Sequence, residues 1–229
     1  MKKKHSSRAR QSERIRQMVI AAMLSAIVAV LTFTPIGMIP LPPPLPSATT
    51  VHIPVLVAVL VEGPMVGLIV GAVFGICSFI RAWELGMVGL TLFFRNPIIS
   101  VLPRLLVPLI AFGAWMIWRR LVKQNVITEK IGTALCAVLG TIANTVMCLG
   151  LIALIYGGDL TVMLNEMISA GNADASYLNH AGQWLVAVVG VPNGIAECIV
   201  AAMIVPMIKT AVDAVIRRTP ARRKKGNTL

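Results

Sequence analysis

The thirty residues from Val51 to Ile80, VHIPVLVAVLVEGPMVGLIVGAVFGICSFI, are almost entirely apolar, and their interruption at Glu62-Gly63-Pro64 decides the fold. As one straight helix they would extend for about 45 Å, which exceeds the roughly 30 Å hydrocarbon core of a bilayer. Proline within a helix breaks or kinks it. We therefore predict two helices here, a short one over about 49–61 and a full span over about 64–80.

The composition of the whole chain indicates that lipid is its solvent. Of its 229 residues, 57% are hydrophobic and 13% are charged, with a mean hydropathy of +0.82. A soluble domain carries roughly 25% charged residues. One water-soluble core cannot bury so much apolar surface, so the sequence predicts an integral membrane protein with no soluble catalytic domain.

Four further apolar segments flank this stretch. They run over about 17–36, 97–118, 131–156 and 184–208. With the two central helices they predict an all-α membrane protein in which residues 17–208 form six transmembrane helices. The segments 81–96, 119–130 and 157–183 are predicted loops. The prolines between Pro35 and Pro46 predict a stiff, extended loop that lies across an opening.

The positions of the basic residues predict the orientation. Residues 1–16, 119–130 and 209–229 hold 18 of the 21 Lys and Arg residues. Because cytoplasmic loops are rich in Lys and Arg, we predict that both termini are cytoplasmic, which requires an even number of spans and supports counting the short helix. Residues 1–16 and 209–229 are thus predicted to be basic tails that meet anionic headgroups, so we do not expect nucleic-acid binding despite the net charge of +12.

Motifs for catalysis are missing from the sequence. It contains no P-loop, no H-E-x-x-H and no G-x-S-x-G pattern, so we expect neither an ATPase site nor an enzyme. The four cysteines lie singly in apolar segments and predict packing, not a disulfide or a metal site. No cofactor is expected. The apolar run Met18–Phe33 resembles a secretory signal but lacks a convincing cleavage site, so we interpret it as a retained helix.

Polar side chains inside the spans are the candidate site, because hydrocarbon disfavours them. Asn96, Ser100 and Arg104 share a face of the fourth span, Asn144 lies near the middle of the fifth, and Asn193 and Glu197 share a face of the sixth. If these faces converge, they form a polar pocket open to the outside. Arg95 and Arg104 would be its cationic part.

Each of these residues also has a purely structural interpretation. Asn144, Asn193 and Glu197 could hydrogen-bond helices together. Arg104 and Glu197 could form an ion pair. His52, at the outer start of the short helix, fits an interface residue as well as a ligand contact.

Small residues form a stripe on the first span. Ala22, Ser25, Ala26 and Ala29 are spaced so that they lie on one helix face, which allows another helix to approach closely. The stripe fits ordinary packing within the chain, or docking of another membrane protein.

Six short segments, taken in order, resemble a known family. They are Ala22-Met-Leu-Ser-Ala26, Thr50-Val-His-Ile-Pro-Val55, Glu62-Gly-Pro-Met-Val-Gly67, Asn96-Pro-Ile-Ile-Ser-Val-Leu-Pro-Arg104, Gly140-Thr-Ile-Ala-Asn-Thr145 and Pro192-Asn-Gly-Ile-Ala-Glu197. The set resembles the substrate-binding S component of energy-coupling factor vitamin transporters. It looks most like the branch associated with pantothenate.

The resemblance implies a subunit of the bacterial plasma membrane that binds one small water-soluble vitamin from outside. It implies partners, a transmembrane coupling (T) subunit and two cytoplasmic ATPases, which would explain the missing P-loop. The family's A-x-x-x-A docking motif maps onto Ala22 and Ala26. The predicted substrate-binding residues are His52, Arg95, Asn96, Arg104, Asn144, Asn193 and Glu197.

Other functions remain open from the sequence. A self-sufficient secondary transporter would use Glu197 as a proton site, although no internal repeat supports it. A structural membrane protein without a ligand would use the polar residues for packing alone.

Overall fold

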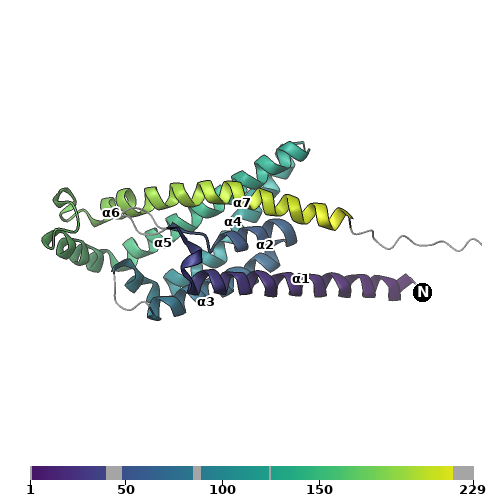
Figure 1. The fold of residues 1–229 in the computed structure, drawn as a ribbon, viewed down its shortest axis with the longest axis horizontal. Coiled ribbons are helices and arrows are strands. Elements are labelled where there is room, and N and C mark those ends of the chain that lie inside the picture. The colour runs from purple at the N-terminus through teal and green to yellow at the C-terminus, as the bar shows by residue number, and fades with distance from the viewer. Residues whose placement is uncertain (1, 40–47, 85–88, 124, 219–229) are drawn as a thin grey trace, which may run out of the picture.

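The computed structural model describes residues 2–39, 48–84, 89–123 and 125–218, which are almost entirely helical. The long helices lie side by side in one elongated bundle (Figure 1). The helices are α1 (Lys2–Phe33), α2 (Ile53–Glu62), α3 (Pro64–Glu84), α4 (Pro97–Leu121), α5 (Val126–Ser169), α6 (Ala181–Trp184) and α7 (Val191–Arg218). Short helical turns are η1 (Pro35–Gly37), η2 (Gly89–Arg95), η3 (Ala175–Tyr177) and the wide π-helical η4 (Leu185–Gly190).

The predicted break between the two central helices is confirmed. α2 ends at Glu62 and α3 begins at Pro64. Between them Gly63 has φ 97°, a conformation that costs little for glycine, and Pro64 occupies the first helical position, where its missing N–H is not needed. The chain reverses at this one residue.

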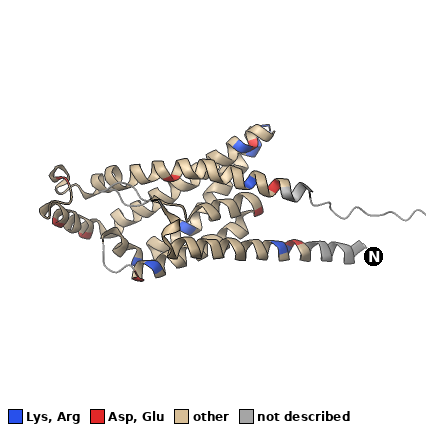
Figure 2. Cartoon of the chain, in the orientation of Figure 1, with Lys and Arg blue, Asp and Glu red and all other residues tan. Residues whose placement is uncertain are grey.

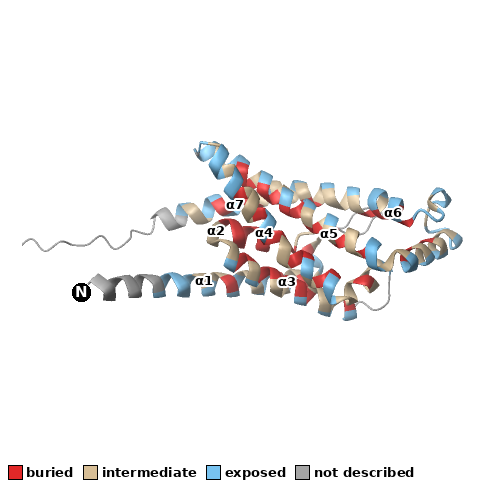
Figure 3. Ribbon diagram, turned by 180° about the vertical axis from the view of Figure 1, so that it is seen from behind, coloured by how far each residue is buried: buried red, intermediate tan, exposed pale blue. Residues whose placement is uncertain are grey.

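Five helical segments are long and apolar enough to cross a membrane. They are Gln11–Phe33, Pro64–Glu84, Pro97–Leu121, Val126–Ser169 and Ala181–Ala214. The ten residues of α2 extend for only about 15 Å, half of a hydrocarbon core, so six full spans remain a prediction. Every residue from Ile53 to Leu60 is buried, so neighbouring helices shield α2 from lipid (Figure 3).

Both ends of the described chain lie at the same end of the bundle. Figure 1 shows the start of α1 and the end of α7 there, with α2 between these two helices in the same view. Residues 2–16, predicted as a tail, continue α1 as helix. Charged residues gather toward the ends of the helices, and the middle of the bundle carries few (Figure 2).

α3 packs closely on α4 beside the candidate site. A Cβ atom on Gly71 would lie 2.5 Å from the carbonyl oxygen of Arg104. Such a distance is not tolerated, so glycine is required for this approach. The backbone of α4 at Arg104 is thereby held directly against α3.

The fifth span is longer than predicted. α5 continues through a kink at Tyr156, which has non-helical angles (φ −121°, ψ 27°), and ends at Ser169. The prediction of a loop over 157–183 was therefore wrong for its first half. Leu160 and Leu164, one turn apart, are buried at the end of the bundle opposite the chain termini, and this packing stabilises the additional helix.

A two-stranded antiparallel ribbon lies between α1 and α2. Strand β1 (Met38–Ile39) pairs with β2 (Ala48–Thr49), with Met38 opposite Thr49. The proline loop predicted to lie across an opening falls largely on residues 40–47, outside the described residues.

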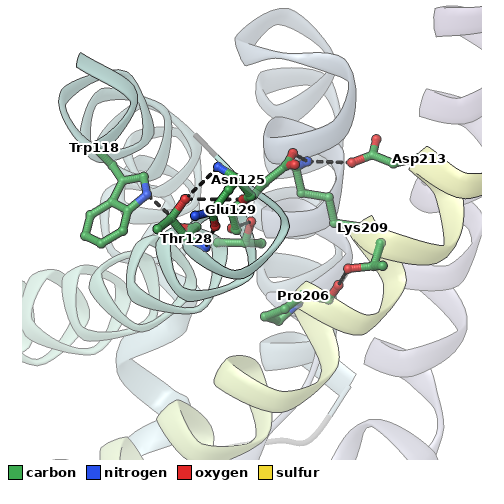
Figure 4. Close-up of polar contacts among 9 residues, drawn as sticks. Trp118, Asn125, Thr128, Glu129, Pro206, Lys209 and Asp213 are labelled. Atoms are coloured by element: carbon green, nitrogen blue, oxygen red, sulfur yellow. Dashed lines mark hydrogen bonds and ion pairs between the residues drawn. The ribbon is translucent and has the colours of Figure 1, made fainter. Parts of the chain in front are cut away.

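An ionic cluster joins α5 and α7 at the end of the bundle where the chain termini lie (Figure 4). Lys209 Nζ lies 2.7 Å from Glu129 Oε1 and 2.7 Å from Asp213 Oδ2, and 5.4 Å from the ring centre of Trp115. Lys209 is buried, with 6% of its surface exposed. The sixth span, predicted to end at Ile208, therefore continues past a lysine, because two carboxylates and an aromatic ring accommodate the ammonium.

Candidate ligand-binding site

Arg104 is a buried cation on α4. Only 7% of its surface is exposed. Its Nη1 donates to the carbonyl of Ile99 (2.9 Å) and contacts the Cys148 sulfur (2.7 Å). The rings of Phe74 and Phe94 lie 5.2 and 5.0 Å from the guanidinium carbon, so aromatic faces flank the charge.

A cysteine links Arg104 to the polar face of α5. The Cys148 thiol contacts the amide oxygen of Asn144 at 3.8 Å, and both residues are buried. Asn144 therefore belongs to the same interior cluster as Arg104, on the opposite helix.

Two further groups belong to this interior, His52 just before α2 and Glu197 on α7. The His52 ring is 1% exposed, and its Nε2 lies 3.1 Å from the Thr141 hydroxyl of α5. Glu197 of α7 accepts hydrogen bonds from the backbone N–H (2.8 Å) and the hydroxyl (3.0 Å) of Thr49 in β2. His52 lies within electrostatic range of both Glu197 and Arg104. Side chains from the start of α2 and from α4, α5 and α7 thus lie within electrostatic range of one another.

A cavity of about 150 Å³ opens beside Arg104, between the end of α1, strand β2, α3 and η2. Its polar lining residues are Thr32, Thr49, Ser78, Arg81, Thr91 and Arg104. Among the described residues that line it, two are arginines and none is a carboxylic acid. The cavity therefore offers hydroxyl groups and positive charge, which suit an anion with hydrogen-bonding groups.

A larger cavity of about 620 Å³ lies elsewhere, between α5 and the segment from α6 to α7. Apolar side chains and glycines form nearly all of its lining, including Gly150, Leu185 and Ile195. No charged residue contributes to it. The chemistry of the lining therefore favours the smaller cavity as the site for a polar solute.

Asn96 and Ser100 serve the backbone at the start of α4. The Asn96 amide oxygen accepts from the N–H of Ile98 (2.9 Å), which makes Asn96 the helix cap, and its amide nitrogen contacts the Tyr156 hydroxyl (3.3 Å). The Ser100 hydroxyl contacts the carbonyl of Phe94. Both residues thus have structural partners.

Arg95 lies away from the interior cluster. Its Nε donates to the carbonyl of Ala82 (3.3 Å), and its guanidinium carbon lies 4.6 Å from the Trp83 ring centre. It lines a separate cavity of about 500 Å³ together with Asn96 and Asp159. The sequence pattern had placed Arg95 and Arg104 in one pocket, and the structure separates them.

Asn193 follows the wide turn η4 at the start of α7. Its amide oxygen is shielded from solvent and has no hydrogen-bond partner among the described residues. Glu197 lies one turn further on and is engaged with Thr49. The two residues predicted to share a face thus differ in their hydrogen bonding.

Comparison with known proteins identifies the family of the chain. Residues 16–209 match the model of the family described as the ECF transporter substrate-specific component. The chain belongs to this family. This S component is also 28% identical over 211 residues to a curated relative, "Pantothenate transporter PanT" of Leuconostoc mesenteroides, with 90% of this chain and 97% of the relative covered. It is thus a multi-pass protein of the bacterial plasma membrane and a transport subunit, as predicted.

The motif expected to dock a partner lies on the free side of α1. Ala22 and Ala26 are exposed in this S component, whereas Ala21 and Val28 are buried against its own helices. The A-x-x-x-A stripe is thus available to another membrane protein, and docking remains a proposal.

Sequence reasoning missed several residues of the interior of this S component. They are Thr49, Phe74, Phe94 and Thr141. Cys148 follows Asn144 by four residues, so its spacing does place it on the same helix face. The contributions of β2 and η2 come from loops, and no helical spacing indicates them.

Proposed function

We propose that this S component binds pantothenate with high affinity at its outer face and delivers it across the membrane with a T subunit and two cytoplasmic ATPases. The observation that carries the proposal is Arg104. It is a buried cation that lines a cavity, and no carboxylate of the described residues pairs with it. An unpaired buried charge is strongly unfavourable, so an anionic ligand is the natural partner.

The chemistry of pantothenate fits this site. It carries one carboxylate, which would meet Arg104 through charge-assisted hydrogen bonds. Its amide and hydroxyl groups would meet polar groups of the interior, among which we place His52, Asn144 and Asn193. The pantothenate-transporting relative supports the same ligand.

The orientation belongs to the proposal as well. The end of the bundle that carries both basic termini would be cytoplasmic, because Lys and Arg favour that side. The cavity beside Arg104 would then open to the outside. Ala22 and Ala26 would contact the T subunit.

Glu197 gives less support to a proton-coupled secondary transporter. Its carboxylate accepts two hydrogen bonds from Thr49, so it serves as a structural acceptor in this conformation. We therefore propose that Glu197 positions strand β2 next to the ligand.

Purified protein tests the proposal directly. The chain is purified in detergent, co-purified small molecules are identified by mass spectrometry, and pantothenate is titrated by calorimetry. We expect binding in the nanomolar to micromolar range and a rise in Tm with the ligand. The absence of both binding and thermal stabilisation by pantothenate would remove this ligand. Uptake into vesicles that contain this chain alone would instead favour the secondary transporter.

A further inference from the structure

Three buried polar atoms of the predicted substrate-binding residues lack hydrogen-bond partners in the described part of the chain. They are His52 Nδ1 just before α2, Arg104 Nε on α4 and Asn193 Oδ1 on α7. Buried polar groups in proteins are nearly always paired, and each exception requires an explanation. Glu62 Oε1 and Arg81 Nε also lack partners, but Glu62 is paired through its other oxygen with Arg16, near the opposite end of α2.

The tautomer of His52 follows from its neighbour. The Thr141 hydroxyl donates its one hydrogen to the carbonyl of Ala137, at 3.0 Å. In this arrangement the hydroxyl accepts from the His52 ring nitrogen, which lies 3.1 Å away. We therefore assign the proton of neutral His52 to Nε2, which leaves Nδ1 as the acceptor.

Two contacts hold this acceptor in place. Thr141 fixes the ring from α5, and the two bonds from Thr49 to Glu197 fix the backbone three residues before His52. Thr49 and Val51 both line the cavity beside Arg104. His52 thus directly follows the cavity-lining residue Val51 in sequence, and its buried ring is held against α5.

The cavity is too small for the proposed ligand as it stands. Its volume is about 150 Å³. Sites for small molecules usually measure roughly 300–1,000 Å³. Binding must therefore enlarge it, and enlargement toward α2 would bring a ligand against the shielded nitrogen of His52.

We propose that His52 is a specificity-determining residue, whose Nδ1 accepts a hydrogen bond from a hydroxyl or amide N–H of the solute as the cavity expands. This inference rests on the proposed function, because it requires that the interior binds a polar solute. It identifies a required feature of that solute, namely a hydrogen-bond donor remote from its carboxylate. A molecule with the carboxylate alone would leave Nδ1 unpaired.

Two substitutions distinguish the roles of the two ring nitrogens of His52. His52→Gln keeps an amide near the position of Nε2, next to Thr141, but leaves no acceptor at the position of Nδ1. His52→Asn can place its amide oxygen near Nδ1. By calorimetry with pantothenate, we expect His52→Gln to weaken binding about tenfold and His52→Asn to weaken it less, as the loss of one hydrogen bond predicts. His180→Gln, at an exposed histidine, is the matched control and should not change affinity.

Nitrogen NMR of the unsubstituted protein tests the inference even if the His52 variants fail to fold. Spectra of ¹⁵N-histidine-labelled protein should show the Nε2–H tautomer for His52, with an Nδ1 resonance that moves when pantothenate is added. An Nδ1–H tautomer, or a resonance that pantothenate leaves unchanged, would overturn the role of His52. Equal affinities of His52→Gln and the unsubstituted protein would do the same. If the unsubstituted protein binds no pantothenate, the proposed function itself fails, and this result is distinct from the other two.

Discussion

Replacing Lys209 by methionine should destabilise the bundle at the end where its termini lie. Methionine keeps the length of the side chain over Trp115 but removes the ammonium that Glu129 and Asp213 share. The two carboxylates are then left beside each other without a counter-ion. Their repulsion and loss of hydrogen bonds should separate the start of α5 from the end of α7.

The magnitude follows from the exposure of the three side chains. Removing one partner of a fully buried pair costs about 3–5 kcal/mol. Here the lysine side chain is 8% exposed, but those of Glu129 and Asp213 are 33% and 30% exposed, so water can rehydrate the carboxylates. We therefore expect a loss of about 2 kcal/mol, below the range for fully buried pairs. For a chain of this length that corresponds to a fall in Tm of about 4–8 °C.

The assay is thermal unfolding in detergent, with two matched variants. Lys130→Met removes the same charge from an exposed position beside Glu129 and should cost less than about 0.5 kcal/mol. The triple variant Lys209→Met, Glu129→Gln, Asp213→Asn should regain part of the lost stability, because no unpaired charge remains. A Tm for Lys209→Met equal to that of Lys130→Met would refute the stabilising role of the cluster.

Four further perturbations test the site and the surfaces around it. Arg104→Ala should weaken pantothenate binding at least tenfold with little change in the ligand-free Tm, since an unpaired buried cation is removed; unchanged affinity by calorimetry would exclude it from the site. Gly71→Ala should cost about 1–3 kcal/mol by overpacking against the Arg104 carbonyl, as measured by Tm, whereas an unchanged Tm would mean that α3 and α4 separate freely. Ala22→Leu with Ala26→Leu should leave binding intact but abolish co-purification with a T subunit, and an intact complex would show that this stripe is not the contact. The backbone N–H of Ser176 (2.8 Å), and then its hydroxyl, lower the pKa of Asp174 by hydrogen bonding to its carboxylate. The local order that this carboxylate gives the loop around Ser176 should therefore be present above the pKa of Asp174 in the unfolded chain, and it should be lost as the pH falls through the lower pKa of the folded chain. An amide exchange rate at Ser176 that shows no such loss of protection at low pH would contradict this.

Local patterns predicted the parts of the fold that depend on neighbouring residues. Gly63 and Pro64 mark the turn between α2 and α3, because one supplies a positive φ and the other begins a helix without an N–H donor. The apolar lengths predicted the long spans. Where tertiary packing decides, the same reasoning failed, as for the helix after Tyr156, which is stabilised by the burial of Leu160 and Leu164.

The candidate site was predicted in part for the same reason. Arg104 and Asn144 are brought into one cluster, but the thiol that joins them comes from Cys148. Asn96 precedes Pro97 at the start of α4, and an asparagine followed by proline is a pattern typical of a helix N-cap. Lys209 seemed to begin a tail because Glu129, the residue that neutralises it, is 80 positions away in the sequence.

Because α2 is only about half as long as a membrane span, it also contributes partial positive charge to the interior of the bundle. Because the helix begins at Ile53, two residues after Val51 in the wall of the cavity beside Arg104, the start of α2 lies inside the bundle. The partial positive charge at a helix start adds to that of the guanidinium. A helix that crossed the whole bilayer would carry this field to the aqueous surface. Stopping midway leaves it inside the protein, where a low dielectric strengthens attraction to an anion.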